Sequence, residues 1–418
     1  MGCPAIRPTG PRRSILPAAL GLFVFVMACS PAPEPRDRPP IRPAPHANTN
    51  TNIWQTAWVP APRPAPTPEP PPPTLGSGVP LNAPATEVPA ESPPPSVARG
   101  TGTPADKKLV EGDTAYARGD YQAAEKAYKA ASDLDRRDPA PVVGVVRARL
   151  AKEGVPTDFG GAPKSRALEA AMKELKRAIK LDPSYAPAHL ELGRALLVMG
   201  KAPEALESLK RAAAIAPNDA EARSALGVAH LATGTIDDAV RELTRSAELA
   251  PGDAERQANL GTALIASGKT ESAIAAYERA VKLAPNDARI RNDLGTAYLA
   301  ANDPDRAVKH LEAAVAKDPQ RATYRSNLGF AWHLKKDLAR AMALYREALA
   351  LDDKLGSAWI NLGNALAQTG KLAEAREAYK KAQAIDPTDP RVKAVLDELD
   401  ALEGKAKTEG SPAKPPPR

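Results

Sequence analysis

Four polar side chains in the second half of the sequence recur at one spacing. Asn259, Asp293, Asn327 and Asn361 follow one another at equal intervals, and each precedes a Leu-Gly pair. An amide group carries both a hydrogen-bond donor and an acceptor, so it can pair with the main chain of any extended peptide. A row of such amides would hold a polypeptide backbone with little regard to its sequence. Because Asp293 and Ala225 interrupt the row, the alternative is that the asparagines only face solvent.

The sequence carries no comparable pattern for catalysis. The histidines show no HExxH or other metal-ligand spacing, and there is no glycine-rich phosphate loop. Acidic residues such as Asp237 and Asp238 fall at a predicted helix start, where capping or solvation explains them better than acid–base chemistry. Cys3 and Cys29 both lie near the N-terminus, so the rest of the chain cannot build a cysteine-based metal site. We predict a protein that is not an enzyme and uses no metal, cofactor or small-molecule substrate.

The charge balance argues against nucleic acid as a partner. The whole chain has 57 Lys and Arg against 50 Asp and Glu, but residues 105–403 carry 45 basic and 44 acidic side chains. A region without a basic excess offers little attraction to phosphates. Aromatic residues make up 4% of the chain, which is too few for base-stacking platforms. We therefore predict no binding of nucleic acid.

Proline content divides the chain into parts. Of its 45 prolines, 23 lie between Pro31 and Pro104, in a stretch with few large apolar residues. Such a stretch cannot bury enough surface to offset chain entropy, so we predict a disordered, proline-rich tether over 29–104. Residues 105–403 have helical periodicity, and the composition of 404–418 again predicts disorder.

The first 28 residues have the order of a secretory signal peptide: three arginines, a short apolar run, and a small residue before the cleavage point. The run is shorter than the roughly 20 residues that a membrane-spanning helix needs. Residues 26–29, with the sequence VMAC, resemble a bacterial lipobox, in which the cysteine becomes the lipid-modified first residue of the mature chain. This resemblance implies lipidation at Cys29 and anchoring in the cell envelope, and Ser30 is typical of lipoproteins sorted to the outer membrane. The alternative is an ordinary secretory signal followed by an incidental cysteine.

Glycines inside the predicted helices recur with the same period as the asparagines. A glycine within a helix costs about 1 kcal/mol relative to alanine, so its repetition needs a packing reason. An alanine and then a leucine or tyrosine follow each glycine at fixed intervals, as Ala273 and Tyr277 follow Gly261. We expect Gly261 to face Ala273 across a helix pair, so that the backbones approach closely, with Tyr277 filling the space beyond. The repeat glycines are Gly193, Gly227, Gly261, Gly295, Gly329 and Gly363.

This pattern resembles the tetratricopeptide repeat in its period, its Leu-Gly pair, its alanines and its closing proline. A period of about 20 to 50 residues is typical of stacked repeats. The resemblance implies an all-α fold, a right-handed superhelix of about eight helix pairs with a capping helix over 390–403. In one unit we predict helices over 254–267 and 270–283. The predicted units are 105–138, 139–185, 186–219, 220–253, 254–287, 288–321, 322–355 and 356–389. The second unit contains an extra loop, EGVPTDFGGAPKS.

Members of this family are interaction scaffolds whose first helices line a concave channel. The resemblance implies a protein or peptide partner in that channel. The row of asparagines is similar to the ladder of O-linked N-acetylglucosamine transferase, whose amides bond an extended peptide. A second binding mode of the family, the carboxylate clamp, needs a Lys and Asn set that this surface lacks. The predicted peptide-binding residues are Asn259, Asn292, Asn327, Asn361 and Asn364.

Three functional hypotheses remain open from the sequence. The first is a lipid-anchored scaffold that helps to assemble an envelope complex, in the manner of pilotin lipoproteins. The second is a periplasmic chaperone or adaptor that holds extended peptides. The third is an accessory subunit of a cell-wall or polysaccharide enzyme. The sequence does not name the partner.

Overall fold

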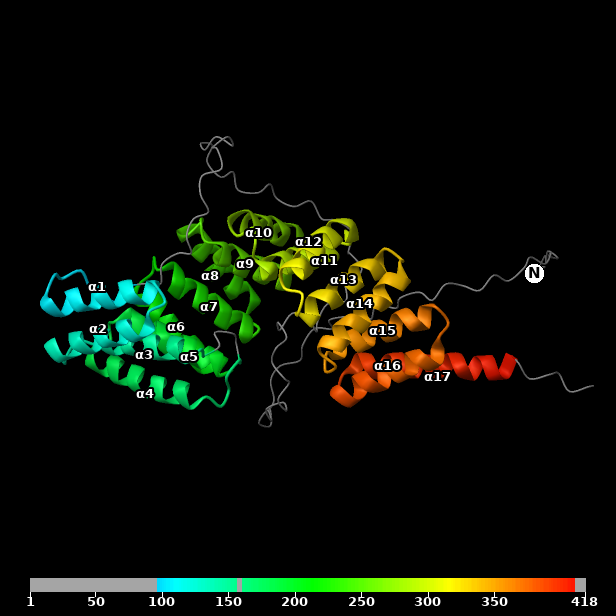
Figure 1. Cartoon of the computed structure of the whole chain (residues 1–418), viewed down its shortest axis with the longest axis horizontal. Helices are drawn as coiled ribbons and strands as arrows, with labels where there is room; N and C mark the ends of the chain where they lie inside the picture. The colour runs from blue at the N-terminus through cyan, green and yellow to red at the C-terminus, as the bar shows by residue number, and fades with distance from the viewer. Residues whose placement is uncertain (1–95, 156–159, 410–418) are drawn as a thin grey trace, which may run out of the picture. The chain divides into compact units, whose positions relative to one another are not determined.

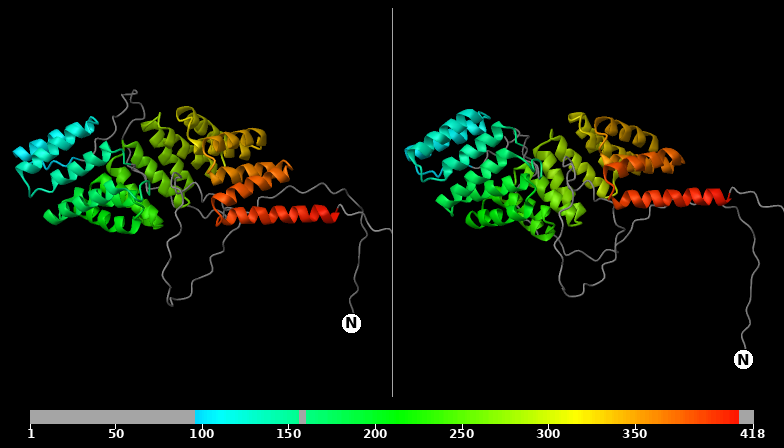
Figure 2. Two further views of the ribbon diagram at one scale, coloured as in Figure 1. Left: turned by 60° about the horizontal axis from the view of Figure 1, so that its bottom comes forward. Right: turned by 90° about the horizontal axis from the view of Figure 1, so that it is seen from below.

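The computed structural model describes residues 96–155 and 160–409, which all fall within one compact unit (Figures 1 and 2). Over these residues the chain is entirely helical, with seventeen helices and no strand. None of the described helices combines the length and the apolar character needed to cross a bilayer. The predicted signal peptide, Cys29 and most of the predicted tether lie outside the described residues, as does the end of the predicted C-terminal tail.

The helix bounds follow the repeat period along the chain. The helices are α1 (Pro104–Ala117), α2 (Tyr121–Leu134), α3 (Ala140–Lys152), α4 (Arg166–Leu181), α5 (Ala186–Val198), α6 (Ala202–Ile215), α7 (Ala220–Ala232), α8 (Ile236–Leu249), α9 (Ala254–Ala266), α10 (Thr270–Leu283), α11 (Ala288–Ala300), α12 (Pro304–Lys317), α13 (Ala322–Leu334), α14 (Leu338–Leu351), α15 (Gly356–Gln368), α16 (Leu372–Ile385) and α17 (Pro390–Glu409).

Successive helices form antiparallel pairs that stack in chain order (Figure 1). Within the stack, each odd-numbered helix contacts the even-numbered helix after it and the even-numbered helix of the preceding pair. Consecutive odd-numbered helices also contact one another from α1 to α15, whereas the described even-numbered helices form no comparable contacts among themselves. The odd-numbered helices therefore line one common side of the stack, which we call the inner face. The expected all-α solenoid of eight helix pairs with a C-terminal helix is confirmed.

Local signals set the ends of these helices. Asp219, Asp253 and Asp287 are N-caps whose carboxylates accept hydrogen bonds from backbone N–H groups of the first turn. The turn inside each pair needs a left-handed residue after the first helix, and glycine usually supplies it. Asn302 (φ 56°) and Lys336 (φ 65°) replace glycine at this turn in two units. A lysine in this conformation costs about 1–2 kcal/mol relative to glycine.

The repeat glycines make room for a large side chain on the second helix of the same pair. A Cβ atom on Gly261 would lie 2.8 Å from Cζ of Tyr277, and one on Gly193 would lie 2.4 Å from Cγ of Leu209. At Gly261 the three nearest atoms all belong to the tyrosine ring. In equivalent units the alanine of the second helix is also close, since a Cβ on Gly295 would lie 3.4 Å from the carbonyl oxygen of Ala307. The close approach of Gly261 to Ala273 stays a prediction. The ring of the second helix packs directly onto the backbone of the first, and any side chain there would displace it.

One boundary agrees with the sequence prediction and two differ from it. The extra loop of the second unit spans 153–165, between α3 and α4, and its backbone N–H groups at Gly160 and Ala162 donate to the last turn of α5. The C-terminal helix α17 continues to Glu409 and extends past α16 (Figure 2), so the predicted disordered tail begins too early. Residues 96–103 were predicted to belong to the disordered tether, yet they pack against the first repeats, because side chains distant in the sequence bind their main chain.

Candidate peptide-binding face

One residue per repeat, two positions before the repeat glycine, forms a row along the inner face. We call it the inner row. Asn259, Asn327 and Asn361 are half-buried there, whereas Asp293 and Ala225 are buried. Each side chain lies on a different odd-numbered helix, so the stacking of repeats sets their order. The inner row consists of Glu191 on α5, Ala225 on α7, Asn259 on α9, Asp293 on α11, Asn327 on α13 and Asn361 on α15.

Two of these asparagines bridge neighbouring repeats. The amide nitrogen of Asn259 donates to Ser224 Oγ at 3.3 Å, and that of Asn327 donates to Asn292 Oδ1 at 2.8 Å. Within the described residues, the amide oxygens of Asn259 and Asn327 accept no hydrogen bond, and neither is a buried unpartnered atom. These two oxygens are therefore accessible acceptors. Asn361 forms no side-chain hydrogen bond to any described residue, so both ends of its amide are open.

Asn292 does not fit the predicted binding set. It is 1% exposed, accepts a hydrogen bond from Asn327, and donates to Asp293 Oδ1 at 3.3 Å. Its amide is hydrogen-bonded within α11 and to α13, and the side chain is buried. It is therefore not accessible to a ligand. Its role is to orient the neighbouring inner-row side chains.

The side-chain oxygen of Asn364 is bonded within its own repeat. Its Oδ1 accepts a hydrogen bond from the Tyr379 hydroxyl at 2.8 Å. The same arrangement recurs where the large residue of the second helix is a tyrosine, because a buried hydroxyl needs a partner. The other pairs are Tyr128 with Asp113 at 2.8 Å and Tyr277 with Thr262 at 2.9 Å. A polar residue directly after the repeat glycine, in a unit whose second helix carries a tyrosine, is thus a sequence signal for internal pairing. Only the amide N–H groups of Asn364 are left for a ligand, and its role in ligand binding stays a prediction.

Tyr345 shows what happens when that polar partner is absent. The equivalent position carries Phe330, and the Tyr345 hydroxyl is a buried atom without a hydrogen bond among the described residues. Burial also raises the pKa of Tyr345 well above its usual range. The repeat tolerates this defect, because the ring still fills the space beside Gly329.

Asp293 is the charged member of the inner row. It is 9% exposed, and burial raises its pKa to about 6, although Arg289 at 3.7 Å and the Asn292 amide act in the opposite direction. Its carboxylate adds a fourth acceptor to the row between Asn259 and Asn327. Four successive repeats therefore carry an oxygen acceptor at one position, three half-buried amides and one buried carboxylate.

The first half of the inner face is chemically different. Glu191 pairs with Arg147 at 2.7 Å, and Glu221 pairs with Arg194 at 2.8 Å and with Arg256 at 2.5 Å. Burial raises the pKa of Glu221, but the two guanidinium groups lower it by more, so the net pKa is below its ordinary value. This chain of ion pairs links α3, α5, α7 and α9. Because its acidic groups already have cationic partners, it offers a bound peptide fewer free acceptors than α9 to α15 do.

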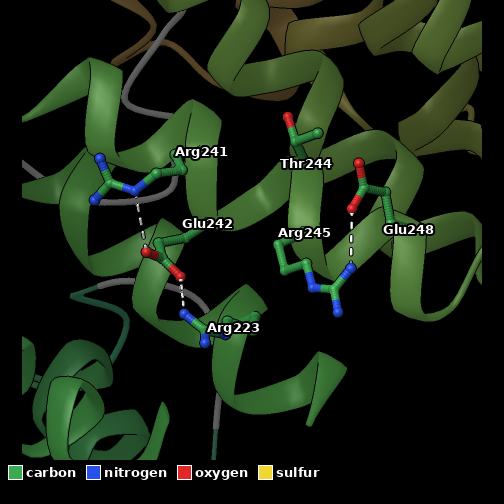
Figure 3. A pocket seen from close by; sticks show the side chains of 6 residues that line it. All are labelled: Arg223, Arg241, Glu242, Thr244, Arg245 and Glu248. Carbon is green, nitrogen blue, oxygen red and sulfur yellow. Dashed lines mark hydrogen bonds and ion pairs between the residues drawn. The ribbon is translucent and has the colours of Figure 1, made fainter. Parts of the chain in front are cut away.

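A shallow depression of about 550 Å³ lies where α8 meets α7, and most of its lining comes from α8 (Figure 3). Its arginines are paired within the chain: Arg223 contacts Glu242 at 2.6 Å, Arg241 contacts Glu242 at 3.5 Å, and Arg245 contacts Glu248 at 3.2 Å. The described residues also contain no cluster of three or more His, Cys, Asp and Glu side chains suited to a metal ion. The inner face remains the candidate site.

The fold and this site define a class of protein: a stacked helical-repeat protein with a row of polar acceptors along its inner face. Two sequence profiles described as tetratricopeptide repeat match the chain, one at 164–224, 199–264, 264–328 and 334–399, the other at 109–145. The first covers more than half of the chain, which therefore belongs to the tetratricopeptide repeat family. Members of this family generally bind protein or peptide partners and typically have no catalytic role. A search of curated proteins gave no significant match.

Solved structures with the same fold include the APC/C hetero-tetramer Cut9-Hcn1, with a TM-score of 0.54 and 17% identity over 72% of this chain. The match covers 57% of the Cut9-Hcn1 chain, so this protein spans little more than half of its length. A tetratricopeptide repeat protein from Parabacteroides merdae ATCC 43184 has a TM-score of 0.50 and 15% identity, covering 63% of this chain and 99% of that one. Pseudomonas aeruginosa pilF has a TM-score of 0.44 and 18% identity, covering 52% and 98%. These likenesses show the fold alone.

Proposed function

We propose that this protein is a non-catalytic scaffold that binds an extended segment of a partner protein along the inner face of α9 to α15. The observation that carries the proposal is the accessible oxygen acceptor on Asn259, Asn327 and Asn361, in three of four successive repeats. Peptide N–H groups are the complementary donors, and every partner sequence supplies them except at proline.

The spacing of the repeats supports this mode of binding. Packed helices lie about 8–10 Å apart, and an extended chain advances about 10 Å in three residues. One acceptor per repeat therefore matches one main-chain donor about every third residue of a peptide that crosses the helices. Between these contacts the other peptide side chains are free to vary, so the groove would favour an extended conformation more than one sequence.

The test uses a library of short random peptides selected on the purified full chain, followed by affinity measurement of the selected peptide. Replacing Asn259, Asn327 and Asn361 together with alanine should weaken binding by about 10- to 1000-fold, since each lost hydrogen bond contributes about 0.5–1.5 kcal/mol. A matched control replaces three exposed residues of even-numbered helices in the same repeats: Ser272, Glu347 and Gln383. The control should bind like the parent. Equal affinity of the asparagine variant and the parent, at unchanged helicity, would reject the inner row as the binding site.

We further propose that the protein acts in the bacterial envelope, anchored by a lipid on Cys29. The support is the order of charged, apolar and small residues before that cysteine. A proline-rich tether between Cys29 and the first repeat would reach on the order of 200 Å when extended, which would hold the repeats away from the membrane. Ser30, directly after the lipidated cysteine, favours sorting to the outer membrane. The bound partner would then belong to an envelope complex that the scaffold helps to assemble.

The anchor has its own test, independent of peptide binding. Replacing Cys29 with serine should abolish incorporation of labelled palmitate and release the protein into the soluble fraction. The matched control is Cys3→Ser, which removes the other cysteine and should leave labelling unchanged. Undiminished labelling of the Cys29→Ser protein would rule out the anchor and leave the binding proposal intact.

A further inference from the structure

The segment before the first helix lies on the inner face in the manner of a bound peptide. The carboxylate of Asp113, on α1, accepts hydrogen bonds from the backbone N–H groups of Val97 at 3.1 Å and Ala98 at 3.3 Å. The same oxygen accepts the hydroxyl of Ser96 at 2.6 Å. Asp113 also bonds Tyr128, so the second helix of the repeat holds the carboxylate in place. The main chain is thus bound by a side chain at the position that carries Thr262 and Asn364 in later repeats.

Val97 makes this contact apolar as well as polar. Its side chain is 1% exposed and belongs to the same buried cluster as Leu109, Tyr128 and Val143. Its carbonyl oxygen accepts a hydrogen bond from the Tyr185 hydroxyl at 2.9 Å, although the two residues are 88 positions apart. A buried β-branched side chain with both its main-chain groups bonded is the arrangement of a ligand residue in a groove.

Arg99 completes the contact beyond Val97. Its guanidinium lies 3.3 Å from Asp138 and 3.2 Å from Asp182, and its Cζ is 4.6 Å from the centre of the Tyr185 ring. Its backbone N–H donates to Asp106 Oδ1 at 2.7 Å. Asp138 and Asp182 come from the loops that end the first two repeats, so Arg99 is bound by two repeats at once.

We propose that residues 96–103 are a built-in ligand of the first two repeats and that an external peptide binds there only by displacing them. The residues that bind the segment also define the peptide that can replace it. Asp113 selects a small residue with free N–H groups, the Val97 pocket selects a β-branched residue, and the two loop aspartates select an arginine two residues later. The expected competitor is therefore an extended peptide with the pattern Ser-Val-Ala-Arg.

This inference rests on the proposed peptide-binding function but uses a different part of the inner face. The proposed binding of partners requires α9 to α15, whereas the built-in ligand lies against α1 and the loops before α3 and α5. Failure of one leaves the other standing, because the variants that test them share no residue. In the first two repeats, residues 96–103 and an added peptide would compete for the same site.

The test uses full-length protein and a fluorescein-labelled peptide with the sequence of residues 94–105. Val97→Asp puts a charge into the apolar pocket, so the segment should leave it. The labelled peptide should then bind on the order of 10- to 100-fold more tightly to the variant than to the parent. The reason is that the segment loses the free energy of burying one valine and therefore competes less well with the added peptide. Hydrogen exchange should show protected amides at Val97, Ala98 and Arg99 in the parent and unprotected amides in the variant.

Val110→Asp is the matched control, because Val110 lies on α1 and is 50% exposed. It introduces the same charge into the same repeat and should leave the segment protected and the peptide weakly bound. A peptide with aspartate in place of its valine should bind neither protein. Arg99→Ala removes the segment's ion pairs with Asp138 and Asp182 but leaves the site itself unchanged, so it gives a milder opening if Val97→Asp loses helicity. Equal peptide affinity for the parent and the opened variants, or no detectable binding to the opened variants at saturating peptide, would overturn the proposal.

Discussion

Replacing Gly261 with leucine tests whether the repeat glycines exist to admit the ring of the second helix. The added Cβ would lie 2.8–2.9 Å from three atoms of the Tyr277 ring. Tyr277 is 4% exposed and its hydroxyl bonds Thr262, so the ring has no open space into which it can move. Displacing it would lose about 1.5–3 kcal/mol of side-chain burial and about 1 kcal/mol of hydrogen bonding. The better helix propensity of leucine returns about 1 kcal/mol, which leaves a net loss of about 1.5–3 kcal/mol in the free energy of unfolding.

Urea denaturation followed by far-ultraviolet circular dichroism measures this loss. The matched control is Gly252→Leu in the preceding turn, where an added Cβ meets no atom within 4 Å and the backbone is not left-handed. The control should unfold within about 0.5 kcal/mol of the parent. If Gly261→Leu unfolds at the same urea concentration as the parent and the control, the packing explanation for the repeat glycine is wrong.

Three further substitutions test individual features by the same denaturation assay. Asp293→Asn should raise the free energy of unfolding at pH 7 by up to about 3 kcal/mol. Burial raises the pKa of Asp293 from 3.8 to about 6 in the folded protein. A carboxyl group with a raised pKa makes the folded protein less stable as the pH rises from about 4 to 6. The variant should lose that pH dependence, and an unchanged pH profile would contradict the assignment. Tyr345→Phe should be neutral or stabilising by about 1 kcal/mol because its buried hydroxyl has no described partner, whereas Tyr277→Phe should cost about 1 kcal/mol; the reverse order would show that Tyr345 is bonded. Lys336→Gly should stabilise by about 1 kcal/mol by relieving the left-handed backbone, and a loss of stability would show that the lysine side chain contributes more than the strain removes.

The sequence predicts the fold closely because the information is local and repeated. The helices predicted over 254–267 and 270–283 correspond to α9 and α10, whose bounds differ from the prediction by one residue at one end. Helix caps, glycine turns and the helical apolar period act within a few residues, and each unit repeats the same signals. The sequence did not predict that the Tyr277 ring would be the nearest neighbour of Gly261, because that depends on how the ring lies between the two helices.

The candidate site was predictable only in part, because its hydrogen bonds join separate repeats. The position of Asn327 in the inner row follows from the period, but its bond to Asn292 depends on the rotation between adjacent helices. The packing of residues 96–103 against the first repeats could not be predicted from the sequence for a similar reason. Their small residues and glycines resemble the rest of the predicted tether, and the groups that bind them, such as Tyr185, are up to 88 positions away.

The most direct test of peptide binding along the inner face is to map where a bound peptide lies. A peptide selected on the full chain, carrying a benzophenone at alternate positions, is photo-crosslinked to the protein and the adducts are located by mass spectrometry. Adducts should fall on α9, α11, α13 and α15, near Asn259, Asn327 and Asn361, and should disappear with excess unlabelled peptide. Adducts confined to the even-numbered helices, under the same competition, would contradict the account.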